Sequence, residues 1–144
     1  MLKLSAGLLI LLIALALQFW FASSGIYLNL AFATLISFAF VFDIWELIVL
    51  VLIAVFTINW QPAASPEILI LALFPVAVHL SRNILHWQPW IENILAVTLG
   101  FLVIYFVMDG RSFLNGPYAF LTDLGAGLIF GSLVLFPLYH WERT

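Results

Sequence analysis

Charge and cysteine are scarce in this sequence. Only 8% of its 144 residues are charged and 66% are hydrophobic, whereas a typical soluble domain carries about 25% charge. A soluble domain of this length buries only about 70% of the surface that its unfolded chain exposes, so a water-soluble fold could not hide so much apolar surface. The missing cysteines exclude disulfides, thiolate metal sites and cysteine nucleophiles. We therefore expect the lipid bilayer to be the solvent of this protein.

The basic residues are too few for nucleic-acid binding. The chain has four lysines and arginines against seven acidic residues, with a net charge of -3. A nucleic-acid-binding protein needs clustered basic residues on one face. We therefore expect the bilayer, and not nucleic acid, to be what this composition is suited to contact.

Glycine and proline are absent from Ile26 to Trp60, and the only charges in these 35 residues are Asp43 and Glu46. A single helix of this length would measure about 52 Å at a rise of about 1.5 Å per residue. The hydrocarbon core of a bilayer is about 30 Å thick. The run must therefore fold back, and we predict a tight turn at the membrane surface where the two carboxylates stand.

Apolar runs near the length of a membrane span predict an all-α integral membrane protein, a bundle of six transmembrane helices in one domain over residues 1–144. The first run, Leu4 to Phe21, could belong to a signal peptide, but it exceeds the roughly 7–15 apolar residues of such a peptide, and we expect a retained span. Asp109-Gly110 predicts a loop after the fifth helix. A start of the last helix at Thr122-Asp123 is an alternative that would make Asp123 a cap. The expected spans are 4–21, 26–42, 44–60, 67–82, 89–108 and 118–139.

The basic residues predict the orientation in the membrane. Six spans place both termini on one side, together with Lys3, Arg82 and Arg143, and leave only Arg111 on the other side. Cytoplasmic loops carry an excess of lysine and arginine. We therefore expect both termini in the cytoplasm.

Asp43 and Glu46 are the first candidate functional residues. They are three apart and share one face if helical. Ionisable residues at membrane depth are costly and often functional, so a proton or cation site is one interpretation. A solvated turn is the simpler one, and binding of a partner is compatible with it.

His79 and Arg82 are also three apart, near the expected cytoplasmic end of their helix. A carboxylate from Asp43 or Glu46 belongs to the same side, so we expect an ion pair with Arg82 that fixes this helix to the preceding hairpin. Coupling of the pair to transport and haem ligation by His79 are the less favoured alternatives.

Asp123 precedes Gly127-x-x-x-Gly131, a spacing that lets another helix approach closely. The approaching helix can belong to this chain or to another subunit, and we favour packing within the chain. We expect no enzymatic activity, catalytic residue, metal site or cofactor, because no nucleophile with its base, phosphate-binding loop or metal-ligand spacing is visible.

The stretch "LALQFWFASSGIYLNLAFATL" carries a family resemblance. Leu17-Gln18 near the end of the first span and Asn29 at the start of the second resemble the rod shape-determining protein D (MreD) family of bacterial inner-membrane proteins. Leu28 stands where that family often has proline. The family's glycine-rich and aspartate-containing positions around the third span are also missing from "LIVLVLIAVFTINWQP". At the level of hydropathy the resemblance covers most of the chain.

The resemblance implies a non-enzymatic scaffold in a cell-envelope complex for cell shape and cell-wall synthesis, working with a bitopic partner. It also implies a six-helix fold similar to the substrate-binding S components of energy-coupling-factor transporters. Two alternatives stay open. One is a small-solute-binding subunit of a transporter, and the other is an accessory subunit of a large respiratory or photosynthetic complex.

Overall fold

The protein is all-α. The computed structural model describes residues 2–59, 65–84 and 87–143, and these residues form six helices. Three segments, Leu2–Ser23, Pro89–Met108 and Tyr118–Trp141, are long and apolar enough to cross a membrane. The all-α class is therefore confirmed, and the three long apolar helices are typical of a multi-pass membrane protein. The helices are α1 (Leu2–Ser23), α2 (Leu30–Phe38), α3 (Ile44–Ile58), α4 (Pro66–Ser81), α5 (Pro89–Asn115) and α6 (Tyr118–Arg143).

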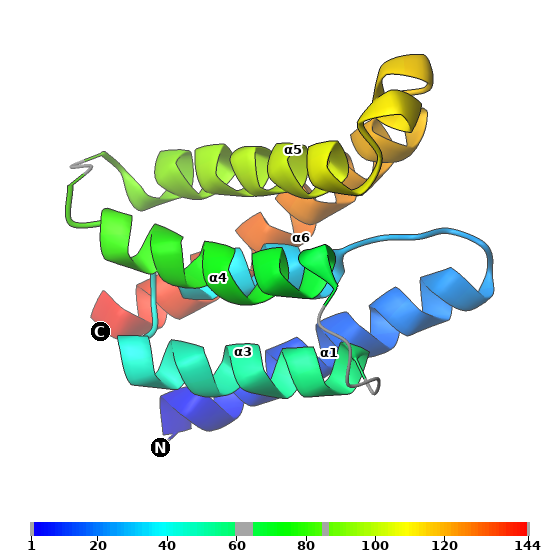
Figure 1. Ribbon diagram of the computed structural model, residues 1–144. Coiled ribbons are helices and arrows are strands. Elements are labelled where there is room, and N and C mark those ends of the chain that lie inside the picture. The colour runs from blue at the N-terminus through cyan, green and yellow to red at the C-terminus, as the bar shows by residue number, and fades with distance from the viewer. Residues whose placement is uncertain (1, 60–64, 85–86, 144) are drawn as a thin grey trace.

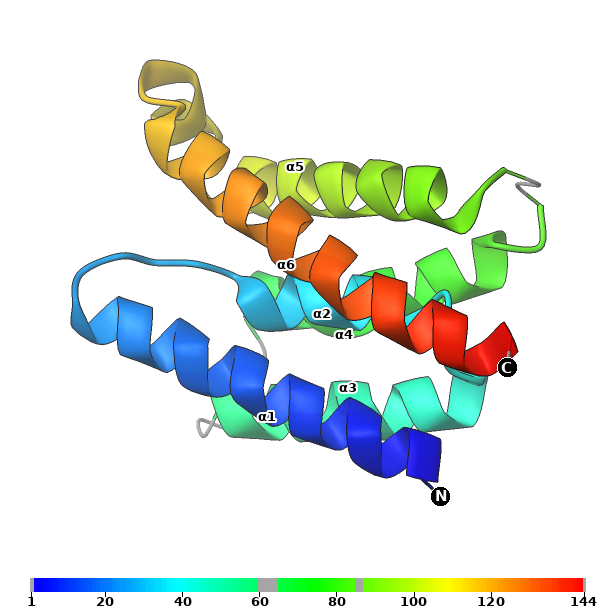
Figure 2. The ribbon, with the colours of Figure 1, turned by 180° about the vertical axis from the view of Figure 1, so that it is seen from behind.

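Successive helices alternate in direction, so both chain ends lie at the same end of the bundle (Figures 1 and 2). We call this the terminal end and the opposite one the distal end. The terminal end holds the starts of α1, α3 and α5 and the ends of α2, α4 and α6. At the distal end, the adjoining turns of α5 and α6 stand away from the other helices, to one side of the bundle (Figure 1).

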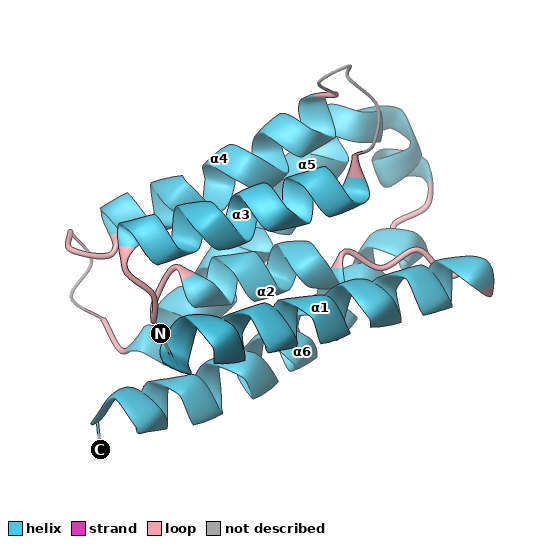
Figure 3. Ribbon diagram, turned by 90° about the horizontal axis from the view of Figure 1, so that it is seen from below, coloured by secondary structure: helices cyan, strands magenta, loops and turns pink. Residues whose placement is uncertain are grey.

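Helix α2 lies at the centre of the molecule. It contacts each of the five other helices, and all nine of its residues are buried. The view from below shows α1, α3 and α6 around it (Figure 3). At a rise of about 1.5 Å per residue it is only about 14 Å long. Its neighbours, rather than lipid, therefore provide its surroundings.

The prediction of a helix over 26–42 was too long at both ends. Residues 26–29 are non-helical, and residues 39–42 form turns after the end of α2 at Phe38. Hydropathy does not distinguish an apolar residue that faces lipid from one that faces protein, so the whole apolar run suggested one span. The expected last residue of the third helix, Trp60, lies outside the described residues.

The prediction of a loop at Asp109-Gly110 was wrong, because α5 continues through both residues to Asn115. Glycine inside a helix costs only about 1 kcal/mol relative to alanine, so one glycine does not end a long apolar helix. The alternative start at Thr122-Asp123 was also wrong, since α6 begins at Tyr118 and Asp123 lies in its second turn.

Glycines allow helices to approach closely at phenylalanine rings. In lipid, helix association depends on van der Waals packing rather than on exclusion of water. A Cβ atom at any of three glycines would lie within 3.0 Å of a ring atom from another helix or from the α2–α3 turn. These contacts are Gly7 with Phe42, Gly100 with Phe74, and Gly127 with Phe101.

Candidate functional site

A buried carboxylate stands at the N-terminal end of α2. Asp123, from α6, is fully buried. Its Oδ1 accepts the backbone N–H of Asn29 at 2.7 Å, and its Oδ2 accepts the Asn29 side-chain amide at 2.6 Å and the Tyr105 hydroxyl, from α5, at 2.7 Å. Both Asn29 groups can only donate, and an ionised carboxylate only accepts. The Asp123 carboxyl oxygens therefore act as the acceptors for both Asn29 groups.

Gln18, from α1, completes this end of α2. Its Oε1 accepts the backbone N–H of Ala31 at 3.0 Å. The first N–H groups of a helix have no partner within the helix. Four helices thus meet at one polar cluster, which we call the Asp123 cluster: Gln18, Asn29, Tyr105 and Asp123.

The C-terminal end of α2 is satisfied by cationic and imidazole side chains. The carbonyl of Ala39 accepts from the Arg82 guanidinium at 3.2 Å and from Nδ1 of His79 at 3.0 Å, so Nδ1 carries the proton. The carbonyl of Val41 accepts from Lys3 Nζ at 2.6 Å. Neighbouring helices therefore satisfy carbonyl groups at both residues.

The expected ion pair between Arg82 and the hairpin carboxylates is not formed in the part of the chain that the structure describes. Arg82 instead donates to the Ala39 carbonyl. The exposed Asp43 is the N-cap of α3, and its backbone N–H donates to the Glu46 carboxylate at 3.3 Å. This capping-box arrangement satisfies the start of α3. Both carboxylates are thus engaged in the local turn between α2 and α3.

The small-residue face of α6 points into the molecule. A Cβ at Gly131 would lie 2.8 Å from Ser37 Oγ, and one at Gly127 would lie 2.7 Å from the Phe101 ring. Beside Gly131, the Ser37 hydroxyl donates to Asn93 Oδ1 at 3.0 Å, and both residues are buried. In this structure the glycines therefore bring α6 close to α2 and α5.

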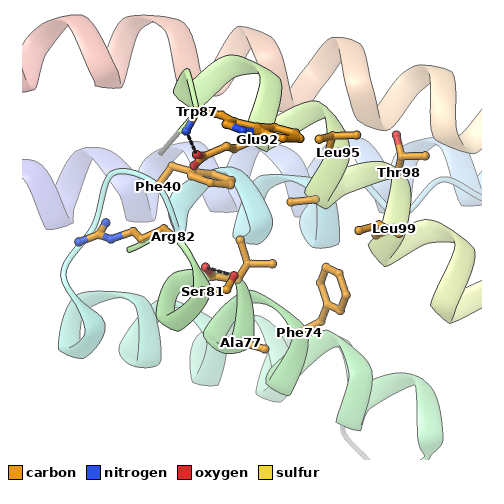
Figure 4. A pocket seen from close by; sticks show the side chains of 12 residues that line it. Phe40, Phe74, Ala77, Ser81, Arg82, Trp87, Glu92, Leu95, Thr98 and Leu99 are labelled. Atoms are coloured by element: carbon orange, nitrogen blue, oxygen red, sulfur yellow. Dashed lines mark hydrogen bonds between the residues drawn. The ribbon is translucent and has the colours of Figure 1, made fainter. Parts of the chain in front are cut away.

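Two hollows flank the first half of α5. The larger, of about 510 Å³, lies between α4 and α5, and we call it the α4–α5 groove. Most of its lining is apolar, and Arg82, Trp87 and Glu92 lie toward the terminal end (Figure 4). The second, of about 350 Å³, lies between α5 and α6 and includes Asn93.

Sequence reasoning missed several polar residues that are buried or half-buried. Gln18 and Asn29 entered only through the family resemblance, and Ser37, Asn93 and Tyr105 were not singled out. The available signal was a polar side chain inside an apolar helix, which in lipid needs a partner. Their partners lie far away in sequence, 94 residues apart for Asn29 and Asp123, so the pairings could not be assigned.

Comparison with known proteins adds no relative. No family model, no curated protein and no solved structure matches this chain.

Proposed function

We propose that this protein is a non-enzymatic scaffold subunit of the bacterial inner membrane, within a cell-envelope complex for cell shape and peptidoglycan elongation. It crosses the membrane six times with both termini in the cytoplasm. Its partners are other integral or bitopic membrane proteins. The cell-envelope assignment comes from the resemblance at Leu17-Gln18 and Asn29.

The observation that carries the scaffold proposal is the pairing of buried polar groups with one another. Among the described residues, no buried side-chain nitrogen or oxygen lacks a hydrogen-bond partner. A solute-binding site instead needs a few polar groups that converge on a cavity and can bond the ligand. In this protein the Asp123 cluster has its donors and acceptors directed at the end of α2. The geometry thus favours a structural use of these groups over solute binding.

Six crossings are consistent with the alternating directions of the six described helices (Figures 1 and 2), although α2, of nine residues, needs its non-helical flanks to complete a crossing. Helices α3 and α4, of 15 and 16 residues, are about 23 and 24 Å long, somewhat short of a core of about 30 Å. Local thinning of the bilayer accommodates such a mismatch. Exposed tryptophans at the terminal end, Trp45, Trp87, Trp90 and Trp141, fit an interfacial aromatic belt.

Labelling of introduced cysteines tests the orientation, because the natural chain has no competing thiol. Asp43 and Gly116 are both exposed, at the terminal and distal ends respectively. In intact spheroplasts, a membrane-impermeant maleimide should label Gly116→Cys but not Asp43→Cys, and lysis should make both reactive. Labelling of Asp43→Cys but not Gly116→Cys from outside would reverse the orientation, and equal labelling of both before lysis would contradict the three crossings, by α3, α4 and α5, between the two positions.

Purification from native membranes in mild detergent, followed by mass spectrometry, tests the scaffold function. The expected result is stoichiometric recovery of a membrane protein of cell-wall synthesis, with recovery from membranes expressing an untagged chain as the control. A protein that runs alone and is stabilised by a vitamin-sized compound would support the solute-binding alternative instead, since a ligand raises the stability of the state that it binds. Recovery with redox or pigment-carrying subunits would support the accessory-subunit alternative.

A further inference from the structure

The α4–α5 groove has two chemically different parts. Its apolar part is formed by Phe74 and Ala77 of α4 and by Leu95 and Leu99 of α5. Leu95 and Leu99 are 43% and 57% exposed, so the groove opens sideways toward the surroundings of the bundle. In a bilayer these surroundings are acyl chains. The open side of the groove therefore faces lipid along its length.

The end of the groove nearest the chain termini carries opposite charges. Arg82 uses one hydrogen bond to the Ala39 carbonyl, and in the described part of the chain it pairs with no carboxylate. A guanidinium has five N–H donors and binds phosphate well. Glu92, 8% exposed, accepts the Trp87 backbone N–H at 2.8 Å through Oε1. Figure 4 shows the Arg82 guanidinium directed toward the α2–α3 turn and the Glu92 carboxylate toward Trp87.

We propose that the α4–α5 groove holds a zwitterionic phospholipid of the bilayer, with its phosphate on Arg82, its ammonium on Glu92 and one acyl chain between α4 and α5. The proposal requires membrane insertion but not the scaffold function. Charge complementarity selects the headgroup, because Glu92 would repel a second negative charge while an ammonium group would offset it. The exposed Trp87 belongs to the aromatic type that lies at headgroup level.

The size of the groove favours a lipid chain over a partner helix. A helix with its side chains is about 10–12 Å across, so a single turn of about 5.4 Å fills roughly 400–600 Å³. The groove, of about 510 Å³, would hold one turn of such a helix. The same volume lies within the range of about 300–1,000 Å³ that is usual for small-molecule sites. An extended acyl chain is thinner than a helix and can lie along the groove, whose lining runs over about two turns of α4, from Phe74 to the C-cap residue Arg82.

Native mass spectrometry of the full chain, delipidated in detergent and then titrated with single lipids, tests this proposal. Phosphatidylethanolamine should bind more tightly than phosphatidylglycerol with the same acyl chains, and diacylglycerol should bind weakest. Arg82→Gln should weaken phosphatidylethanolamine binding roughly tenfold, the scale of one lost charge-assisted hydrogen bond. Glu92→Gln should remove the preference over phosphatidylglycerol while keeping binding of both.

A groove-filling variant keeps the test independent of any structural role of Arg82. Ala77→Phe places a ring in the apolar part and leaves both charges, and it should reduce lipid binding as Arg82→Gln does. Leu80→Phe is the matched control on the same helix, because Leu80 is 65% exposed and does not line the groove. Equal binding of the two phospholipids to the natural chain, or full binding by Ala77→Phe, would overturn the proposal. Crosslinking of a partner's helix into the groove would also overturn it, without affecting the scaffold proposal.

Discussion

A comparison of two glycines on α6 tests the close packing of this helix. A Cβ at Gly127 would lie 2.7, 3.2 and 3.3 Å from three ring atoms of Phe101, whereas a Cβ at Gly125 would meet nothing within 4 Å. Ordinary contacts of this kind begin at about 3.4 Å. Phe101 is fully buried, and its ring centroid lies 5.7 Å from that of Phe32. The ring therefore has little room to withdraw.

The two alanine substitutions should differ in their effect on the free energy of unfolding. Gly127→Ala should lower the free energy of unfolding by about 1–3 kcal/mol, the usual cost of overpacking a core. Gly125→Ala adds the same methyl group to the same helix in open space, and should be neutral or stabilise by up to about 1 kcal/mol through helix propensity. Gly125→Ala therefore serves as the control for any general effect of alanine on α6.

The free energy of unfolding can be measured for the full chain in mixed micelles with increasing SDS, by tryptophan fluorescence and circular dichroism. Phe101→Leu shrinks the opposing ring, so combining it with Gly127→Ala should cost at least 1 kcal/mol less than the sum of the two single changes, a coupling typical of residues in contact. Equal stability of the two alanine variants within about 0.5 kcal/mol, the usual error of additivity, would refute the close approach of α6 to Phe101.

Three further predictions use the same measurement. Asp123→Ala should lower the free energy of unfolding by about 2–5 kcal/mol because three donors lose their acceptor. Thr122→Ala is the control and should change it little, since that exposed hydroxyl bonds only within its own helix. Equal losses of stability in the two variants would contradict a structural role of the Asp123 cluster. Gln18→Leu should cost about 1 kcal/mol as the lost cap of Ala31, and an unchanged stability would contradict that bond. Asp43→Ala should lower the free energy of unfolding by about 0.5–2 kcal/mol because α3 loses its N-cap. This loss should be additive with that of Arg82→Gln, and strong coupling between the two changes would instead support an ion pair between Asp43 and Arg82.

The sequence predicted the number and type of helices because both follow from local properties. The length of an apolar run and the two carboxylates at the fold-back, Asp43 and Glu46, can both be read directly from a short stretch of sequence. The length of α2 could not be predicted in this way. Its ends depend on which neighbours supply polar partners, and those partners come from α1, α4 and α6.

The candidate site was predictable only in part, for a related reason. Asp123 was named as a candidate beside the Gly127-x-x-x-Gly131 spacing, but its partners Asn29 and Tyr105 are residue types that are common near helix ends and in membrane helices. The expected pairing of Arg82 with a carboxylate rested on charge alone. In the structure a backbone carbonyl at the end of α2 takes that role, and no sequence pattern identifies which carbonyl is left without a helical partner.

Several of the few charged side chains of this protein bond to the ends of α2. The helix has no charged residue of its own, yet the carboxylate of Asp123 bonds at its N-terminal end, while Arg82 and Lys3 donate to carbonyls at or just beyond its C-terminal end. This is the order that complements a helix dipole, which favours negative charge at the N-terminus and positive charge at the C-terminus. In the proposed six-span arrangement, a helix of about 14 Å cannot reach both surfaces of a bilayer core of about 30 Å, so at least one of its ends must find polar partners at membrane depth. Each unsatisfied backbone group there would cost several kcal/mol. A chain with so few charges therefore places several of them where they hold its central helix.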